Sequence, residues 1–278
     1  MPALVQTAVK TLASLVYHVP MDHNTREIHW WIKYKIKNLF KYRTFDFFYK
    51  VELETITNCN RRCSYCPNSK TPKTPRLMEE TIFKKAVADL ADINYSGILA
   101  PHFYGEPLLD SRLPNLLSYA KQKLPNTSIL LYTNGDYLSR ELFLKLKDSG
   151  VNDFFVTEHE NKPPKKFMEW HASASASDKK HIIFQKMNEN SILSNRGGAA
   201  VVAHKKPFSK CSIPRNNLVI NADGNVLLCC NDFFGKYVFG NIKEKPLIDI
   251  WHSEPYAKAR NEINKGEFNL EICKKCRS

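Results

Sequence analysis

The stretch VELETITNCNRRCSYC (residues 51–66) joins a strand-like segment to three closely spaced cysteines. Its first part, residues 51–57, has the β-branched and apolar composition of a buried strand. Cys59, Cys63 and Cys66 follow with the spacing C-x3-C-x2-C. Three thiolates on one short loop can hold only three irons of a [4Fe–4S] cluster, whereas ferredoxins supply a fourth cysteine. The spacing therefore predicts a cluster with one iron open to a small molecule.

Two other readings of this loop stay open at this point. Cys63 and Cys66 alone would also suit a zinc ion or a redox-active pair. A zinc ion would need a fourth ligand at short range, and the next cysteine in the chain is Cys211. The cluster is therefore the preferred interpretation.

Length and composition set the broad class. A chain of 278 residues with 43% hydrophobic content can bury a large core, so we expect one main domain with a small appendage. Its eight cysteines, without a secretory signal, indicate a reducing compartment in which thiolates bind metals. No stretch approaches the roughly 20 apolar residues that span a bilayer. We expect a cytoplasmic protein.

The formal net charge of +13 raises the question of an anionic partner. Basic proteins often bind nucleic acid, but the lysines are dispersed here and the sequence contains no nucleic-acid-binding motif. We expect no nucleic-acid partner. A local excess of charge could attract an anionic small molecule, and the rest is expected to be solvated surface.

The middle of the chain alternates between two periodicities. The pattern predicts strands at 51–57, 98–104, 128–134, 151–157 and 181–186, and helices at 77–90, 113–123 and 140–147. Such alternation is typical of parallel β/α units, whose reactive residues gather at the C-terminal ends of the strands. We predict an α/β fold, a partial (β/α)6 TIM-like barrel over residues 51–206. Residues 161–180 are polar and low in complexity, and predict a surface loop.

Both ends of the chain differ from this middle part. Residues 1–50 form a basic, aromatic extension, and the segment 29–49 could contact a membrane surface; packing against the following domain is the favoured alternative. Residues 207–278 predict a small domain with a hairpin of strands 218–220 and 226–228, a helix over 248–263 and a terminal C-x2-C.

Four late cysteines could complete a second metal site. A fully ligated [4Fe–4S] cluster and a four-cysteine zinc site both fit this pattern, and the cluster upstream favours iron. The four residues are Cys211, Cys229, Cys273 and Cys276. Cys230 is left over, either as a small buried hydrophobe or as a thiol that faces the active site.

The C-x3-C-x2-C loop resembles that of the radical S-adenosylmethionine (SAM) superfamily. In that family the open iron chelates SAM, and one electron from the cluster cleaves it to a 5′-deoxyadenosyl radical that abstracts hydrogen from carbon. The resemblance implies two [4Fe–4S] clusters, one SAM-binding and one auxiliary, with SAM as cofactor. It also implies an electron donor such as flavodoxin or ferredoxin.

Further positions match the places where this family binds SAM. Glu106 follows the second predicted strand, where the family carries a Gly-Gly-Glu type motif, and could accept hydrogen bonds from the SAM ammonium. Polar residues also end the third and fourth predicted strands. The predicted cofactor-binding residues are Tyr65, Gly105, Glu106, Asn134, Glu158 and His159.

Longer strings resemble one small branch of radical SAM dehydrogenases that act on amino-cyclitols and carry a "twitch" domain, a shortened SPASM domain. The matching strings are HFYGEPLL (102–109), YTNGD (132–136), LSNRGG (193–198), GNI (240–242) and DIWH (249–252). By this resemblance the four late cysteines hold the auxiliary cluster. Tyr104, Tyr132 and Arg196 would line the substrate pocket, with Arg196 touching the reacting hydroxyl and assisting its deprotonation. Asn231 is a fourth predicted substrate residue.

One departure from that branch leaves the outcome of the reaction open. The branch has Phe and then a substrate-contacting Glu after the second auxiliary ligand, and this chain has Cys230 and Asn231. Arg196 favours oxidation of a sugar-like, cyclitol or aminoglycoside-type alcohol to a ketone, with electron transfer to the auxiliary cluster. Cys230 favours epimerisation, in which a thiol returns hydrogen to the opposite face. A zinc-stabilised basic binding protein is the distant alternative.

Overall fold

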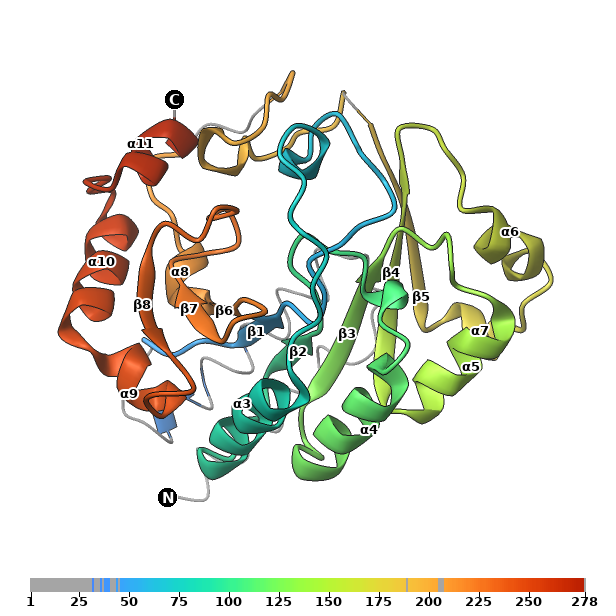
Figure 1. Cartoon of the computed structure of the whole chain (residues 1–278), viewed down its shortest axis with the longest axis horizontal. Coiled ribbons are helices and arrows are strands. Elements are labelled where there is room, and N and C mark those ends of the chain that lie inside the picture. The colour runs from blue at the N-terminus through green and yellow to red at the C-terminus, as the bar shows by residue number, and fades with distance from the viewer. Residues whose placement is uncertain are drawn as a thin grey trace, which may run out of the picture.

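The fold is built on one continuous sheet (Figure 1). The computed structural model describes residues 32, 36, 38–40, 44, 46–188, 190–204 and 208–277, so most of the N-terminal extension lies outside it. The strand order is β5-β4-β3-β2-β1-β6-β7-β8. The strands are β1 (Lys50–Leu53), β2 (Ile98–Ala100), β3 (Ser128–Thr133), β4 (Val151–His159), β5 (Ile182–Met187), β6 (Asn217–Ile220), β7 (Asn225–Leu227) and β8 (Val238–Asn241).

The pairing of the strands confirms the predicted α/β class. β1 to β5 are parallel, and β1 also pairs in parallel with β6 on its other side. The hairpin β6–β7 and the pair β7–β8 are antiparallel. The C-terminal region therefore extends the parallel sheet directly, and the last parallel strand of the described chain is also the first strand of the predicted hairpin.

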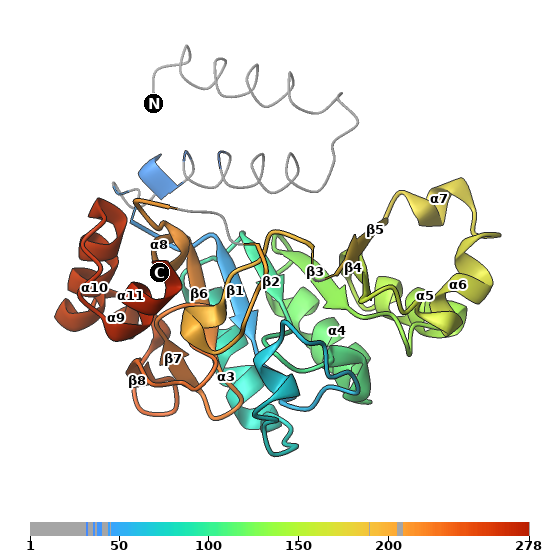
Figure 2. The same ribbon diagram turned by 90° about the horizontal axis from the view of Figure 1, so that it is seen from above.

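Three amphipathic helices cover one face of the parallel strands (Figure 2). They are α3 (Glu80–Asp92), α4 (Leu113–Lys123) and α5 (Arg140–Asp148). Each presents a buried apolar stripe to the sheet, for example Phe83 and Val87 of α3 and Leu117 of α4. Ser139 caps the N-terminus of α5 by accepting a hydrogen bond from the backbone N–H of Leu142. These contacts leave the ends of the strands free to carry side chains.

Two predictions of local structure were wrong. The predicted loop 161–180 contains α6 (Lys165–His171) and α7 (Ala176–Lys179). Phe167 and Trp170 are buried in the core because residues three apart share one face of a helix. The predicted helix 248–263 is two helices, α9 (Leu247–His252) and α10 (Glu254–Lys265). Pro255 lies in the first turn of α10, where proline is tolerated, and it cannot continue α9.

The C-terminal region adds further short elements. They are α8 (Ile213–Asn216) and α11 (Glu271–Arg277). Elsewhere the described residues form 3-10 turns η1 (Pro67–Ser69), η2 (Pro107–Leu109) and η3 (Arg196–Gly198). The turn η3 lies against α11, which carries the terminal cysteines. This contact brings Arg196 close to the C-terminal cysteine pair.

The residues just before β1 belong to the folded core. Phe47 and Phe48 are buried and pack against Trp251, with ring centroids 6.4 and 4.9 Å apart. Asp46 forms an ion pair with the buried Arg260 at 3.0 Å. Residues 46–48 therefore pack against the domain, as the favoured alternative required. Most of 29–45 lies outside the described residues, so the membrane contact through 29–49 stays a prediction. None of the described helices combines the length and the apolarity of a membrane span.

Candidate active site

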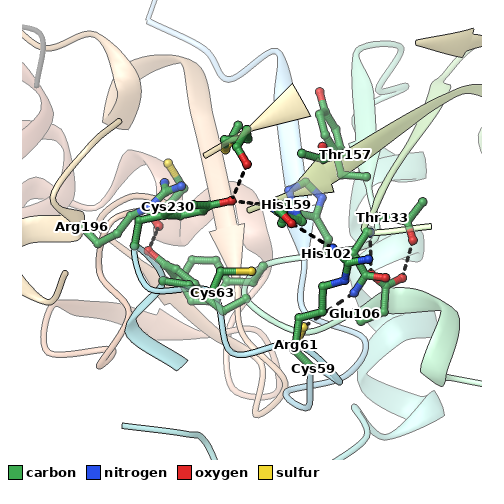
Figure 3. A pocket seen from close by; sticks show the side chains of 18 of the residues that line it. Cys59, Arg61, Cys63, His102, Glu106, Thr133, Thr157, His159, Arg196 and Cys230 are labelled. Atoms are coloured by element: carbon green, nitrogen blue, oxygen red, sulfur yellow. Dashed lines mark hydrogen bonds between the residues drawn. The ribbon is translucent and has the colours of Figure 1, made fainter. Parts of the chain in front are cut away.

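A cavity of about 310 Å³ lies at the C-terminal ends of the parallel strands (Figure 3). Each strand from β1 to β5 contributes side chains to it, from its last residues or from the loop that follows. The cavity brings together most of the predicted site residues: Cys59, Cys63, Tyr65, Cys66, Tyr104, Gly105, Glu106, Tyr132, Asn134, His159, Arg196 and Cys230. Residues 59–159 share one site because parallel strands end at the same edge of the sheet. Arg196 and Cys230 reach it from the connections that follow β5 and β7.

The loop after β1 places its three cysteines at one end of the cavity. Arg61 fixes this loop to the end of β3, because its Nε donates to Oδ2 of Asp136 at 2.7 Å. Its Nη1 also donates to the carbonyl oxygen of Lys162 at 3.0 Å. The two contacts hold the loop between the ends of β3 and β4.

The chemistry of these thiols suits a positively charged group. Burial raises the pKa of Cys59 and Cys66, and it raises the pKa of Cys63 to about 12. Thiols in such a place need a bound cation to be held as thiolates. Three sulfur donors on one loop, without nearby histidine or carboxylate partners among them, fit the iron of a cluster.

Next to the cysteine loop, the buried carboxylate of Glu106 joins two segments of the cavity wall by hydrogen bonds. Its carboxylate accepts hydrogen bonds from Thr133 Oγ1 at 2.6 Å, from the N–H of Asn134 at 2.8 Å and from the N–H of Leu108 at 3.1 Å. Burial raises the pKa of Glu106 to about 7 against the opposing effect of these donors. The carboxylate thereby ties the loop after β2 to the end of β3, which positions Asn134 beside Cys59.

Gly105 allows this loop to approach the end of β1. A methyl group at this position would overlap the backbone carbonyl oxygen of Ile56. Any side chain would therefore push the loop after β2 away from the cysteine loop. The role of Gly105 is close backbone approach.

Tyr65 and His159 form one hydrogen-bonded pair in the wall. The hydroxyl of Tyr65 lies 2.7 Å from Nδ1 of His159 and donates to the carbonyl oxygen of Met187 at 3.2 Å. Burial lowers the pKa of His159 to about 4, so the imidazole is neutral at pH 7.

Glu158 does not enter the cavity, contrary to the prediction. Its carboxylate pairs with Lys186 of β5 at 3.3 Å. The neighbours Thr157 and His159 line the cavity instead. Successive side chains of a strand point to opposite faces, so the middle residue of this triplet is turned away.

The other end of the cavity carries Tyr104, Arg196 and Cys230. The hydroxyl of Tyr104 donates to the carbonyl oxygen of Cys230 at 2.9 Å. The Arg196 guanidinium carbon lies 5.8 Å from the centroid of the Tyr104 ring. Burial raises the pKa of Cys230 to about 12, which keeps its thiol protonated. These groups form a mixed aromatic and polar wall of the kind that lines small-molecule sites.

The turn η3 holds Arg196 in an uncommon backbone conformation. Arg196 has φ 52°, and Gly197 and Gly198 follow with φ 63° and 85°. A methyl group on Gly197 would overlap the side chain of Ile272 in α11. A left-handed conformation at a non-glycine residue is costly, and such conformations cluster at functional sites. The strain here serves to direct the arginine into the cavity.

Asn231 lies behind the cavity lining, next to Arg196. Its Oδ1 accepts hydrogen bonds from Ser194 Oγ at 3.0 Å and from Arg196 Nη1 at 3.4 Å. Its Nδ2 is 3.5 Å from the sulfur of Cys276. This amide therefore connects the arginine to the second group of cysteines.

The four late cysteines converge around a second, smaller cavity. Cys211, Cys229, Cys273 and Cys276 all line it, together with Phe268. Burial raises the pKa of Cys211 and Cys229, and it raises that of Cys273 to about 12. In the described parts of the chain, no three His, Cys, Asp or Glu side chains converge tightly enough to hold a single metal ion. Sulfur donors spread around a cavity suit a cluster, which occupies the space between its ligands.

Sequence reasoning missed several residues of the first cavity, among them Glu52, His102 and Gln185. Glu52 had a visible signal, since a carboxylate inside a strand of a parallel sheet is unusual. His102 lies within a string that was recognised, and burial lowers its pKa well below the usual range. Gln185 had no signal, because it reaches the cavity only through the pairing of β5 with β4.

Comparisons with known proteins agree with this geometry. Residues 53–157 match the radical SAM superfamily, and residues 211–277 match SPASM, an iron–sulfur cluster-binding domain. The S-adenosyl-L-methionine-dependent 2-deoxy-scyllo-inosamine dehydrogenase of Niallia circulans is 33% identical over 233 residues, which is 82% of this chain and 92% of that protein.

Solved structures give the same answer. The crystal structure of BtrN in complex with AdoMet and 2-DOIA has a TM-score of 0.78 and 32% identity, and covers 84% of this chain and 94% of that one. BtrN in an open conformation has a TM-score of 0.66 and 29% identity, and covers 84% and 93% of the two chains. The chain belongs to the radical SAM superfamily, in the group that carries a C-terminal SPASM iron–sulfur cluster-binding domain.

Proposed function

We propose that this radical SAM enzyme oxidises a carbinol carbon of a sugar-like, cyclitol or aminoglycoside-type substrate to a ketone. The observation that carries the proposal is one cavity with Cys59, Cys63 and Cys66 at one end and Arg196, Tyr104 and Cys230 at the other. The similarity to a 2-deoxy-scyllo-inosamine dehydrogenase supports an alcohol as the reacting group.

The cofactors of the family are SAM and [4Fe–4S] clusters. In this proposal the three cysteines after β1 hold the SAM-binding cluster, and Cys211, Cys229, Cys273 and Cys276 hold the auxiliary cluster. When bound, these groups supply a 5′-deoxyadenosyl radical that removes hydrogen from carbon and an acceptor for one electron.

The chain itself positions the reactants. The ion pair between Arg61 and Asp136 fixes the cysteine loop, and Glu106 holds the end of β3 in place to present Asn134 to the cofactor. Tyr132 stacks on Phe155 with centroids 4.6 Å apart, which leaves its ring as a rigid wall for the substrate. Tyr65 and His159 close the wall nearest to β5.

Arg196 holds the reacting hydroxyl. Its guanidinium offers several N–H donors in a fixed plane and cannot be deprotonated in proteins. Arg196 therefore orients the oxygen and stabilises negative charge that develops on it, and the hydroxyl proton must go to a different group. Asn231 keeps the guanidinium in place from behind.

Epimerisation is the second candidate function, and Cys230 is the observation that favours it. This thiol lines the cavity and stays protonated, which is the form that can donate a hydrogen atom. Reaction in deuterated water separates the two candidates. Deuterium at an inverted carbon indicates an epimerase, and a ketone indicates a dehydrogenase.

The partners follow from the proposed chemistry. The enzyme needs a low-potential electron donor, for which we propose a flavodoxin or ferredoxin. A donor protein with an acidic surface would associate quickly with this chain, whose net charge is +13, because opposite charges speed association. The cytoplasmic location stays a prediction.

The test is anaerobic reconstitution followed by assay. We expect about eight irons and eight sulfides per chain, as two cubanes require. With SAM, reductant and 2-deoxy-scyllo-inosamine, we expect 5′-deoxyadenosine and a ketone. A colourless protein with zinc and no iron would support the distant alternative of a zinc-stabilised binding protein and would refute the proposal.

A further inference from the structure

Glu52 brings a carboxylate into the middle of the sheet. It lies on β1, in register with Ala100 of β2 and Val219 of β6. Its neighbours Val51 and Leu53 point into the apolar core, so alternation turns Glu52 to the opposite face, where it lines the active-site cavity. The residue is only 4% exposed. Burying a carboxylate in such a place costs folding free energy unless hydrogen-bond or ion-pair partners compensate for the lost water, or its function requires it.

The carboxylate of Glu52 has hydrogen-bond acceptor sites that its protein partners do not use. Lys50 Nζ lies 3.4 Å from its Oε1, which is longer than the usual 2.7–2.9 Å of a charge-assisted hydrogen bond. No donor from the described part of the chain makes a hydrogen bond to its Oε2. A carboxylate has about four acceptor sites. Because Glu52 lines the cavity, this unused capacity can serve a ligand there.

Other residues of the cavity are poorly suited to accept a proton. Arg196 cannot lose one and so offers no base. Burial, together with Lys50 and Arg196, lowers the pKa of His102 well below its usual range, which makes the imidazole a weak base. Glu106 already accepts three hydrogen bonds within the protein. Tyr104 and Cys230 carry their protons at neutral pH, because burial raises the pKa of both.

Glu52 also lies within electrostatic reach of the groups around the reacting oxygen. Its charge acts on both Arg196 and Cys230. A carboxylate beside an arginine can receive a proton from the same hydroxyl that the arginine orients. Lys50 neighbours the same carboxylate, with its Nζ 3.4 Å from Oε1.

We propose that Glu52 is the general base that takes the substrate's hydroxyl proton during the oxidation. The inference rests on the proposed dehydrogenation. Abstraction of hydrogen from the carbinol carbon leaves a carbon radical that still carries its O–H. The O–H bond then breaks, the proton passes to Glu52, and one electron leaves as the C=O bond forms; the auxiliary cluster would accept that electron. The alcohol thus loses one hydrogen atom, one proton and one electron, and becomes a ketone.

The Glu52→Gln variant tests this role in the reconstituted holoenzyme. Without reductant, we expect SAM and 2-deoxy-scyllo-inosamine to bind by calorimetry with affinities within roughly threefold of wild type, because glutamine preserves the shape. With reductant, 5′-deoxyadenosine should still form, while ketone formation falls about 100-fold, as expected for loss of a general base. The ratio of 5′-deoxyadenosine to ketone should rise, and a substrate radical should appear in the EPR spectrum.

Two further variants secure the interpretation. Glu52→Asp keeps the carboxylate and should restore a large part of ketone formation. Glu54→Gln is the matched control, since Glu54 is equally buried and paired with Lys73 at 2.6 Å, but lines a different cavity. It should keep the wild-type ratio of products even if the protein is less stable.

The outcomes separate this inference from the proposed function. A wild-type enzyme that makes no ketone from 2-deoxy-scyllo-inosamine or from any of a panel of cyclitol and aminoglycoside alcohols refutes the dehydrogenation and the base together. A wild-type enzyme that makes ketone, with Glu52→Gln retaining the wild-type product ratio, overturns the base alone. Loss of substrate binding in both Glu52→Gln and Glu52→Asp would also overturn it and would assign Glu52 to binding.

Discussion

The side-chain amide of Asn231 donates a hydrogen bond to the sulfur of Cys276, with Nδ2 3.5 Å from Sγ. The same amide accepts from Arg196 on its oxygen side. The proposed substrate-binding arginine and the proposed auxiliary-cluster ligand are therefore bridged by one residue. Hydrogen bonds to cluster sulfurs are among the features that set reduction potentials.

Removing this donor should lower the reduction potential of the auxiliary cluster. Asn231→Leu deletes the N–H that stabilises the more negative, reduced state. A hydrogen bond worth about 1 kcal/mol corresponds to roughly 40 mV for one electron. We expect a decrease of this order in an EPR-monitored redox titration. Asn195→Leu serves as the control, because Asn195 donates to the backbone of Lys275 rather than to a sulfur. An unchanged potential in Asn231→Leu would contradict the expectation.

His159 should make the stability of the protein depend on pH. Burial lowers its pKa from 6.5 to about 4, so the unfolded chain binds a proton first as the pH falls. This contribution to stability is therefore complete above pH 6.5 and is lost progressively towards pH 4. Between pH 7.5 and 5.5, we expect a loss of about 1 kcal/mol from this group.

Urea unfolding of wild type and His159→Asn at pH 7.5 and 5.5 measures the contribution of His159 to the unfolding free energy. The variant has no imidazole to titrate, so its free energy of unfolding should fall less between the two values. Other titrating groups contribute equally to both proteins, and the difference isolates His159. Equal slopes in the two proteins would contradict the neutral, buried imidazole.

Gly105→Ala should disrupt the cavity. The added methyl group would overlap the carbonyl oxygen of Ile56, which belongs to the backbone and cannot rotate away. We expect a loss of about 3 kcal/mol or more in unfolding free energy, as for overpacked sites. Gly235→Ala is the matched control: its methyl group would meet Leu227 at an ordinary 3.6 Å. Only its φ of 62° opposes the change, at a cost of about 1–2 kcal/mol.

Local signals explain which parts of this site could be predicted. The spacing of Cys59, Cys63 and Cys66, and the strand before them, are written in consecutive residues, so the pattern carries them directly. Glu158 was misplaced because the end of a strand does not reveal which of two faces a residue takes. The helix around Phe167 was hidden in a polar segment, where two aromatic residues alone mark the buried face. Glu52 and Gln185 meet in the cavity only through tertiary packing.

Cys230→Ala should separate the two reaction outcomes. The thiol lines the cavity next to Arg196, but oxidation to a ketone needs no hydrogen atom from it. If the enzyme is a dehydrogenase, the variant should form ketone within roughly threefold of the wild-type rate, because the change removes only a small side chain from the wall. Cys229→Ala is the contrasting variant, since Cys229 lines the four-cysteine cavity and is a proposed cluster ligand. That change should lower the iron content and abolish ketone formation. Ketone formation by wild type that disappears in Cys230→Ala, with a full complement of iron, would mean that the thiol takes part in the oxidation itself.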